Sequence, residues 1–117
     1  MNVTEINGVR VFRTPENGPP LGSEQDALDL LGEAYGHDAT MIAVSASRLH
    51  EDFLKLRTGM AGAFLQKMQN YGFRFAVVGD ISAAVTESEA LRDFVYESNK
   101  MGRMLFVADD EELARRL

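Results

Sequence analysis

The spacing of apolar and polar positions divides the chain into short apolar runs and longer stretches with helical periodicity. At the amino end, Val3 to Ile6 and Val9 to Phe12 are two short runs that flank Asn7-Gly8. An Asn-Gly pair favours the two positive φ angles of a type I′ turn, which is a strong signal for a β-hairpin. The start of the chain therefore predicts two antiparallel strands.

Three further apolar runs predict buried strands. They are Met41 to Val44, Phe73 to Val78 and Met104 to Val107. Because each run is separated from the next by a stretch with helical spacing, we expect the three strands to be neighbours in a mostly parallel sheet. Neither face of any of them is expected to be open to solvent.

Four stretches have the spacing of amphipathic helices. Ser23 is a candidate cap for the first helix, which we expect to end at Gly36. Its apolar face is predicted to hold Ala27, Leu28, Leu31, Ala34 and Tyr35. The second helix is marked by Met60, Ala61, Phe64, Leu65, Met68 and Tyr71. It begins either after Thr58 or near His50. The third is expected over Glu87 to Asn99 and the last over Asp109 to Leu117.

The order of elements is therefore ββαβαβαβα, which predicts one α/β domain over residues 1–117 with a mostly parallel sheet and an N-terminal β-hairpin. The pattern leaves open whether the domain has two layers or three. The loop richest in proline and glycine, residues 14–22, is too short to separate two domains.

Charge and composition exclude several classes of function. The chain has 12 Lys and Arg against 18 Asp and Glu, and its net charge is −6. Without a basic face to displace counterions, we expect no nucleic-acid binding and no attraction to an anionic membrane. No signal-like segment and no long apolar run is present, so we expect a soluble cytoplasmic protein. The absence of cysteine excludes disulfides and thiolate metal sites.

Four blocks of residues resemble a bacterial family catalogued as a domain of unknown function, number 4180. The blocks are Phe53-x-x-Leu56-x-Thr58-Gly59-x-Ala61-Gly62, Gln66-Lys67-x-x-Asn70-Tyr71, Ala76-Val77-Val78-Gly79-Asp80 and Phe94-x-x-Glu97-x-Asn99-x-x-Gly102. The resemblance covers nearly the whole chain. It implies a fold and a bacterial-type cytoplasmic protein, and it implies no reaction because the family has no established one.

The order of elements also resembles that of STAS domains, the fold of anti-sigma factor antagonists. That resemblance implies a regulatory switch at a serine or threonine before a glycine at a helix start, and Thr58-Gly59 holds such a position. The Asp-Ser-Ser/Thr-Gly motif of STAS domains is absent, and Leu56-Arg57 stands in its place. We therefore expect Thr58 to cap a helix rather than to be phosphorylated.

Polar residues follow the predicted buried strands at the edge where ligands of open α/β sheets bind. They are Ser45, Ser47, Asp80, Ser82 and Asp109. Asp80 is the best candidate, because Gly79 allows a sharp turn that aims the next carboxylate at the crevice. The alternative is that these residues only terminate strands and cap helices.

Two further sets of residues complete the candidate ligand-binding site. Thr58-Gly59 opens a helix whose free amides could bind an anion, although a Walker loop is excluded by the spacing and the missing lysine. Glu97 and Asn99 belong to one of the resembling blocks, while an exposed helix face is their alternative role. The set is thus Ser45, Thr58, Gly59, Asp80, Glu97 and Asn99.

The sequence contains no complete catalytic or metal-binding motif. Two histidines without His-Glu-x-x-His argue against a metal site, and we expect no cofactor. Neither Gly-x-Ser-x-Gly nor a Ser–His–Asp arrangement is recognisable. The first hypothesis is therefore a non-enzymatic regulatory or interaction module of STAS-like architecture that binds a protein, a second copy or a small ligand. The alternative is a small enzyme or metabolite-binding protein that uses Asp80, Ser45 and Glu97 in a strand-end crevice.

Overall fold

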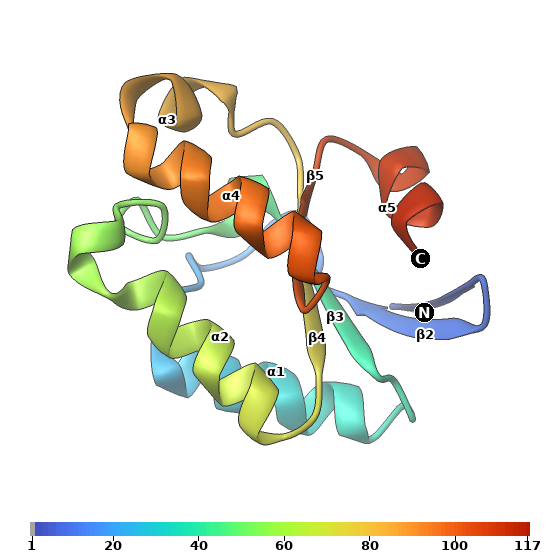
Figure 1. Ribbon diagram of the computed structural model, residues 1–117. Coiled ribbons are helices and arrows are strands. Elements are labelled where there is room, and N and C mark those ends of the chain that lie inside the picture. Colours follow the sequence, from blue (N-terminus) through green and yellow to red (C-terminus); the bar gives the residue numbers. More distant parts are fainter. Residues whose placement is uncertain (1) are drawn as a thin grey trace.

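A computed structural model describes residues 2–117 of the chain, and a five-stranded sheet forms its centre (Figure 1). The strands are β1 (Val3–Ile6), β2 (Val9–Arg13), β3 (Met41–Ser45), β4 (Arg74–Val78) and β5 (Met104–Val107). They lie side by side in the order of the sequence. Only β1 runs antiparallel to its neighbour β2, and the other pairs are parallel. The prediction of adjacent, mostly parallel buried strands is confirmed.

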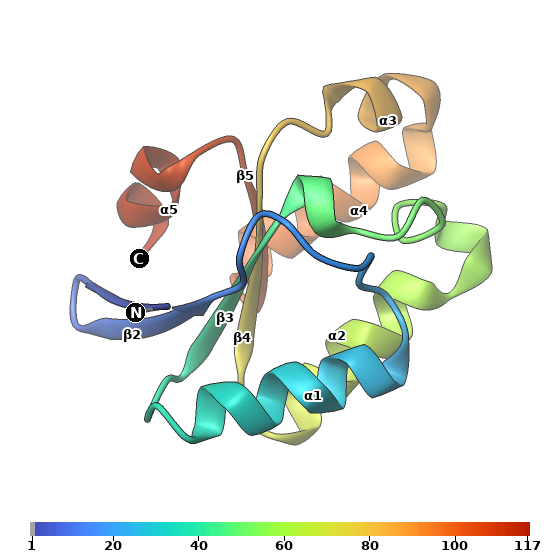
Figure 2. The same ribbon diagram turned by 180° about the vertical axis from the view of Figure 1, so that it is seen from behind.

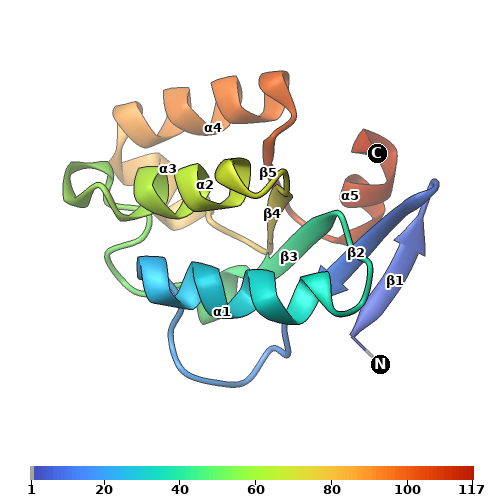
Figure 3. The ribbon, with the colours of Figure 1, turned by 90° about the horizontal axis from the view of Figure 1, so that it is seen from below.

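Helices cover both faces of this sheet. They are α1 (Glu24–Tyr35), α2 (Met60–Asn70), α3 (Ser82–Glu87), α4 (Glu89–Met101) and α5 (Asp110–Arg116), with the short 3-10 turns η1 (Ala46–Arg48) and η2 (Leu56–Thr58). The helices α1, α2 and α4 lie on one side of the sheet, while α5 lies on the other side beside the hairpin (Figure 3). The result is a three-layer α/β arrangement that confirms the predicted order, with α3 and the two turns added.

The hairpin forms at the predicted dipeptide. Asn7 has φ 50° and Gly8 has φ 84°, so both turn residues adopt the positive angles that a type I′ turn requires. Val3 then lies opposite Phe12 and Ile6 opposite Val9. The register is fixed by this two-residue turn.

Each face of the sheet has its own apolar core. Phe53 and Phe64 pack with Phe75 of β4 under α2, with ring centroids 5.0 to 6.4 Å apart. On the opposite face, Leu113 of α5 is fully buried against Ala76 of β4 and its neighbours. No helix within residues 2–117 has the length and apolar character needed to cross a membrane.

The helix expected over Glu87 to Asn99 is present as α4, Glu89–Met101, and a short helix that was not expected, α3, precedes it over Ser82–Glu87. Ser88 adopts φ −137° and ψ 111°, an extended conformation that separates α3 from α4. Its hydroxyl accepts a hydrogen bond from the Leu91 amide at 3.1 Å and so caps α4.

Of the two alternative starts expected for the second helix, the one near His50 is wrong. The helix α2 starts at Met60, directly after Gly59 at φ 74°.

Two tyrosines that the periodicity placed on apolar helix faces are exposed instead. Tyr35 keeps 76% of its surface accessible and Tyr71 keeps 59%. Both rings stand at the ends of their helices, where they flank a hollow floored by Leu31 and Phe73. Tyr71 follows the last residue of α2, whereas Tyr35 is the last residue of α1 and is exposed on it.

Candidate functional site

The carboxyl ends of β3, β4 and β5 meet at one edge of the sheet, as parallel pairing requires. Two adjoining hollows of about 510 Å³ each open at this edge, and together we call them the carboxyl-edge crevice. They share the residues Glu16, Ser45, Val78 and Gly79. The volume is in the range that small ligands occupy.

Ser45 and Gly79 form the floor between the two hollows. Ser45 ends β3, is half-buried and does not use its hydroxyl to cap the η1 turn. Gly79 follows β4 at φ 142°, and a Cβ on it would come within 2.8 Å of the Ala46 Cβ. Only glycine therefore permits this close approach of the two strand ends.

Asp80 lies where the sequence analysis expected it, on the lining of the crevice. Its Oδ1 also accepts a hydrogen bond from the Ser82 amide at 2.8 Å, at the start of α3. Hydrogen bonding to Ser82, from its side chain and its amide, lowers the pKa of Asp80. The same side chain therefore lines the crevice and closes the turn that precedes α3.

Carboxylates outnumber cations along the crevice. Its second hollow includes Asp109 and Asp110 at the turn from β5 into α5, with Arg13 at the end of β2. Arg13 donates a hydrogen bond to Asp110, which lowers the pKa of Asp110 although partial burial opposes the shift. Asp109 accepts from the Glu112 amide at 2.9 Å. With Glu16 and Asp80 included, the crevice carries a net negative charge.

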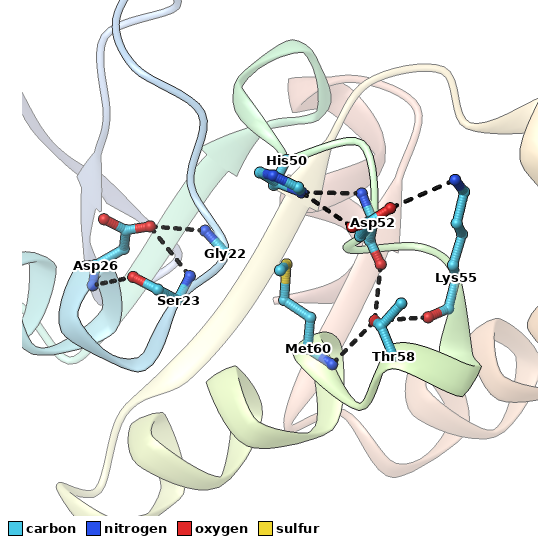
Figure 4. A network of polar contacts seen from close by, with 8 residues as sticks. All are labelled: Gly22, Ser23, Asp26, His50, Asp52, Lys55, Thr58 and Met60. Atoms are coloured by element: carbon cyan, nitrogen blue, oxygen red, sulfur yellow. Dashed lines mark hydrogen bonds and ion pairs between the residues drawn. The ribbon is translucent and has the colours of Figure 1, made fainter.

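Thr58 and Gly59 lie outside the residues that line the crevice. The Thr58 hydroxyl is 2.8 Å from the carbonyl oxygen of Lys55 and 3.0 Å from that of Asp52, and it accepts from the Met60 amide at 3.2 Å (Figure 4). These bonds join the η2 turn to the first residue of α2. The geometry supports the structural role expected for Thr58.

Glu97 and Asn99 lie on α4 and are not brought to Asp80. Glu97 is exposed. The Asn99 side chain is bonded to the backbone of Phe106 in both directions: its Oδ1 accepts from the Phe106 amide at 2.7 Å, and its Nδ2 donates to the Phe106 carbonyl at 3.1 Å. In this structure the Asn99 side chain therefore pairs with the backbone of β5, the outermost strand of the sheet. Its ligand-binding role stays a prediction.

Sequence reasoning missed Arg48, which is buried beside the crevice with 8% of its surface exposed. Its guanidinium donates to the carbonyls of Pro15 and Pro19, and it thereby fixes the loop that carries Glu16. No periodicity or spacing distinguishes this arginine from the exposed ones. Only the partners that the fold supplies do so.

The described part of the chain, residues 2–117, holds no group of three His, Asp or Glu side chains that could bind a metal ion. His50 Nδ1 accepts from the Asp52 amide at 3.1 Å. Among these same residues, no serine or threonine hydroxyl donates to a histidine. The lining of the crevice includes carboxylates, the Ser45 hydroxyl, the Arg13 guanidinium and small or apolar residues.

A family model described as Domain of unknown function (DUF4180) matches residues 6–117. The chain belongs to this family. The DUF4180 resemblance inferred from the residue blocks is thereby confirmed over most of the chain. No curated protein and no solved structure matches the chain, and nothing in the comparisons confirms the resemblance to STAS domains.

Proposed function

We propose that this DUF4180 chain is a non-enzymatic regulatory module that binds a small polar ligand in the carboxyl-edge crevice. One observation carries the proposal: Ser45, Asp80 and Asp109 come from the ends of three different strands and line one pair of adjoining hollows. Convergence at strand ends is how open α/β sheets build ligand sites.

The chemistry of the lining indicates which ligands fit. Glu16, Asp80 and Asp109 accept hydrogen bonds, whereas Arg13 is engaged by Asp110. A ligand that carries N–H or O–H donors, such as an amine, complements this surface better than an anion does. The missing nucleophile–base pair favours binding over catalysis, so the small enzyme is the weaker alternative.

A thermal-shift screen of polar metabolites tests the proposal, because a ligand that binds only the folded state raises the melting temperature. A ligand present at 100 times its Kd adds about 2.7 kcal/mol of stability. We expect amine-bearing hits that bind in a 1:1 ratio by calorimetry.

Two crevice variants locate the site. Asp80→Asn keeps an oxygen for the Ser82 amide but removes the charge, and Ser45→Ala removes a hydroxyl that caps nothing. Both are expected to weaken binding about tenfold or more, which is about 1.4 kcal/mol. Asp93→Asn on the exposed face of α4 is the matched control and should bind normally. Lost stability with normal binding would make Asp80 a cap only, and a ligand bound at the opposite edge would refute the proposal.

The expectation of a protein partner or a second copy remains a prediction. Size-exclusion chromatography with light scattering, with and without a ligand hit, measures whether the module changes its oligomeric state when it binds.

A further inference from the structure

The segment between β2 and α1 crosses the carboxyl edge of the sheet beside the η1 turn, where it is drawn in blue (Figure 2). We call residues 15–20 the strap. All six residues are exposed, and Glu16 of the strap lines both hollows of the crevice. The strap is therefore one wall of the proposed binding site.

The strap is fixed at its two ends by backbone hydrogen bonds. At one end the Thr14 amide donates to the Ala43 carbonyl at 3.1 Å. At the other end the Leu21 amide donates to the Arg48 carbonyl at 2.7 Å, and the His50 amide donates to the Leu21 carbonyl at 2.8 Å. Between these two ends, the position of the strap depends on side chains.

One side chain bonds the strap near both of its ends. Arg48 Nη1 donates to the Pro15 carbonyl at 2.6 Å, and Arg48 Nε donates to the Pro19 carbonyl at 3.1 Å. In the part of the chain that the structure describes, no other hydrogen bond joins residues 15–20 to the rest of the molecule. Besides the backbone bonds of the flanking residues Thr14 and Leu21, the hydrogen bonds of this guanidinium are therefore what attach the strap to the body of the protein.

Arg48 is an unusual residue to bury. It is 92% buried, since 8% of its surface is exposed, and no carboxylate within residues 2–117 lies close enough to pair with it directly. Asp26 interacts with its charge only at longer range. A buried charge without a directly paired carboxylate is costly, and an apolar residue of similar size often serves stability as well or better. Packing alone therefore does not explain an arginine here, whereas two carbonyls that need a forked donor do.

Gly18 is matched to this guanidinium. Its φ is 151°, and a Cβ on it would come within 2.7 Å of Arg48 Cζ and 2.8 Å of Arg48 Nη2. Any side chain at this position must displace the guanidinium, because the strap passes directly over it. The position of the Arg48 guanidinium therefore requires glycine at position 18.

We propose that Arg48 is a latch that positions the strap as a movable wall of the carboxyl-edge crevice. Breaking its two bonds releases the strap and leaves the sheet and its cores intact. The latch concerns the motion of the strap and needs no ligand, so it stands or falls separately from the binding proposed above.

A spin label on the strap tests the latch directly. The chain has no cysteine, so Asn17→Cys provides a single labelling site in the exposed middle of the strap. Arg48→Met removes the donors and keeps a long side chain. Gly18→Ala displaces the guanidinium while Arg48 remains, and it also strains the backbone of the strap, because Gly18 has φ 151°. Arg103→Met is the matched control, because Arg103 is exposed and its side chain makes no hydrogen bond among residues 2–117.

We expect the rotational correlation time of the label to shorten at least twofold in Arg48→Met and Gly18→Ala and to stay unchanged in Arg103→Met. Arg48→Lys should fall between, because an ammonium group lacks the fork that reaches both carbonyls at once. Circular dichroism at the same temperature verifies that each variant is folded. A folded Arg48→Met protein with an equally immobile label would overturn the latch. If that variant does not fold, Arg48→Lys decides the question: a label as immobile as in the parent chain would then overturn the latch.

Discussion

Asn99 replaces a neighbouring strand at the edge of the sheet. The strand β5 is the last in the order, so its outer backbone groups have no partner strand. Asn99 satisfies both groups of Phe106, with bonds of 2.7 and 3.1 Å. An unpaired edge is a template for association with other chains, and a side-chain amide that occupies it removes part of that hazard.

We predict that Asn99→Ala lowers the free energy of unfolding by about 1–3 kcal/mol, because two partly buried backbone groups lose their partners. Urea denaturation measures the effect. Asn70→Ala is the control: Asn70 is exposed and bonds only Gln66 on its own helix, so its loss should cost about 0.5 kcal/mol or less. Equal costs for the two variants would contradict the edge role of Asn99.

The conformation or hydrogen bonding of a residue was predictable from the sequence where it depends on residues nearby in the chain. Asn7-Gly8 adopts its turn, and Thr58 bonds groups within six residues of itself. Asn99 and Arg48 bond partners that the fold brings to them, namely Phe106 and the strap carbonyls. No local pattern marks such residues.

At the scale of elements, the start of α1 is a reciprocal capping arrangement. The Ser23 hydroxyl accepts from the Asp26 amide at 3.0 Å, and the Asp26 carboxylate accepts from the amides of Gly22 and Ser23 at 3.0 Å each (Figure 4). The sequence analysis identified Ser23 as the cap. Partial burial tends to raise the pKa of Asp26, but the hydrogen bonds from Ser23 and Gly22, aided by Arg48 at longer range, lower it overall.

This lowered pKa predicts the sign of a pH effect. A carboxyl whose pKa is lower in the folded state stabilises the protein above its unfolded pKa, near 4, and this contribution is lost as the pH falls through the folded value. We expect Asp26→Asn to be less stable than the parent at pH 6 and the difference to shrink steadily below about pH 4.

Urea midpoints of both proteins between pH 6 and pH 2.5 measure this difference. Asp93→Asn, on the exposed face of α4, should run parallel to the parent throughout. A difference for Asp26→Asn that stays constant across the acid range would show that the capping bonds do not depend on the charge.

For the whole molecule, the two faces of the sheet are covered unequally. Three helices pack on one face, whereas α5 covers the other. This short helix is held by Arg13, which bonds Asp110, and by Asn7, which donates to the Ala114 carbonyl at 2.8 Å. Leu113 is its fully buried anchor.

We predict that Leu113→Ala lowers the free energy of unfolding by about 2–5 kcal/mol, because it leaves a cavity that only one helix could fill. Equilibrium urea unfolding checks the value. Leu117→Ala, at a partly buried position directly after the same helix, should cost distinctly less. If the two variants lose similar stability, Leu113 is not the residue through which α5 stabilises the core on its face of the sheet.

The sequence by itself determined the features that local chemistry decides. These are the strand and helix order, the hairpin turn, the α1 cap and the burial of β3, β4 and β5, because periodicity and turn residues act over a few neighbours. Only the tertiary structure decided which residues distant in the sequence contact one another. It divided Asp80 from Glu97, set Asn99 on the strand edge, left Tyr35 exposed and placed Arg48 under the strap. The hydrogen bonds of Arg48 join residues 29 and 33 positions apart, so they exist only once the chain is folded, and no spacing in the sequence encodes them.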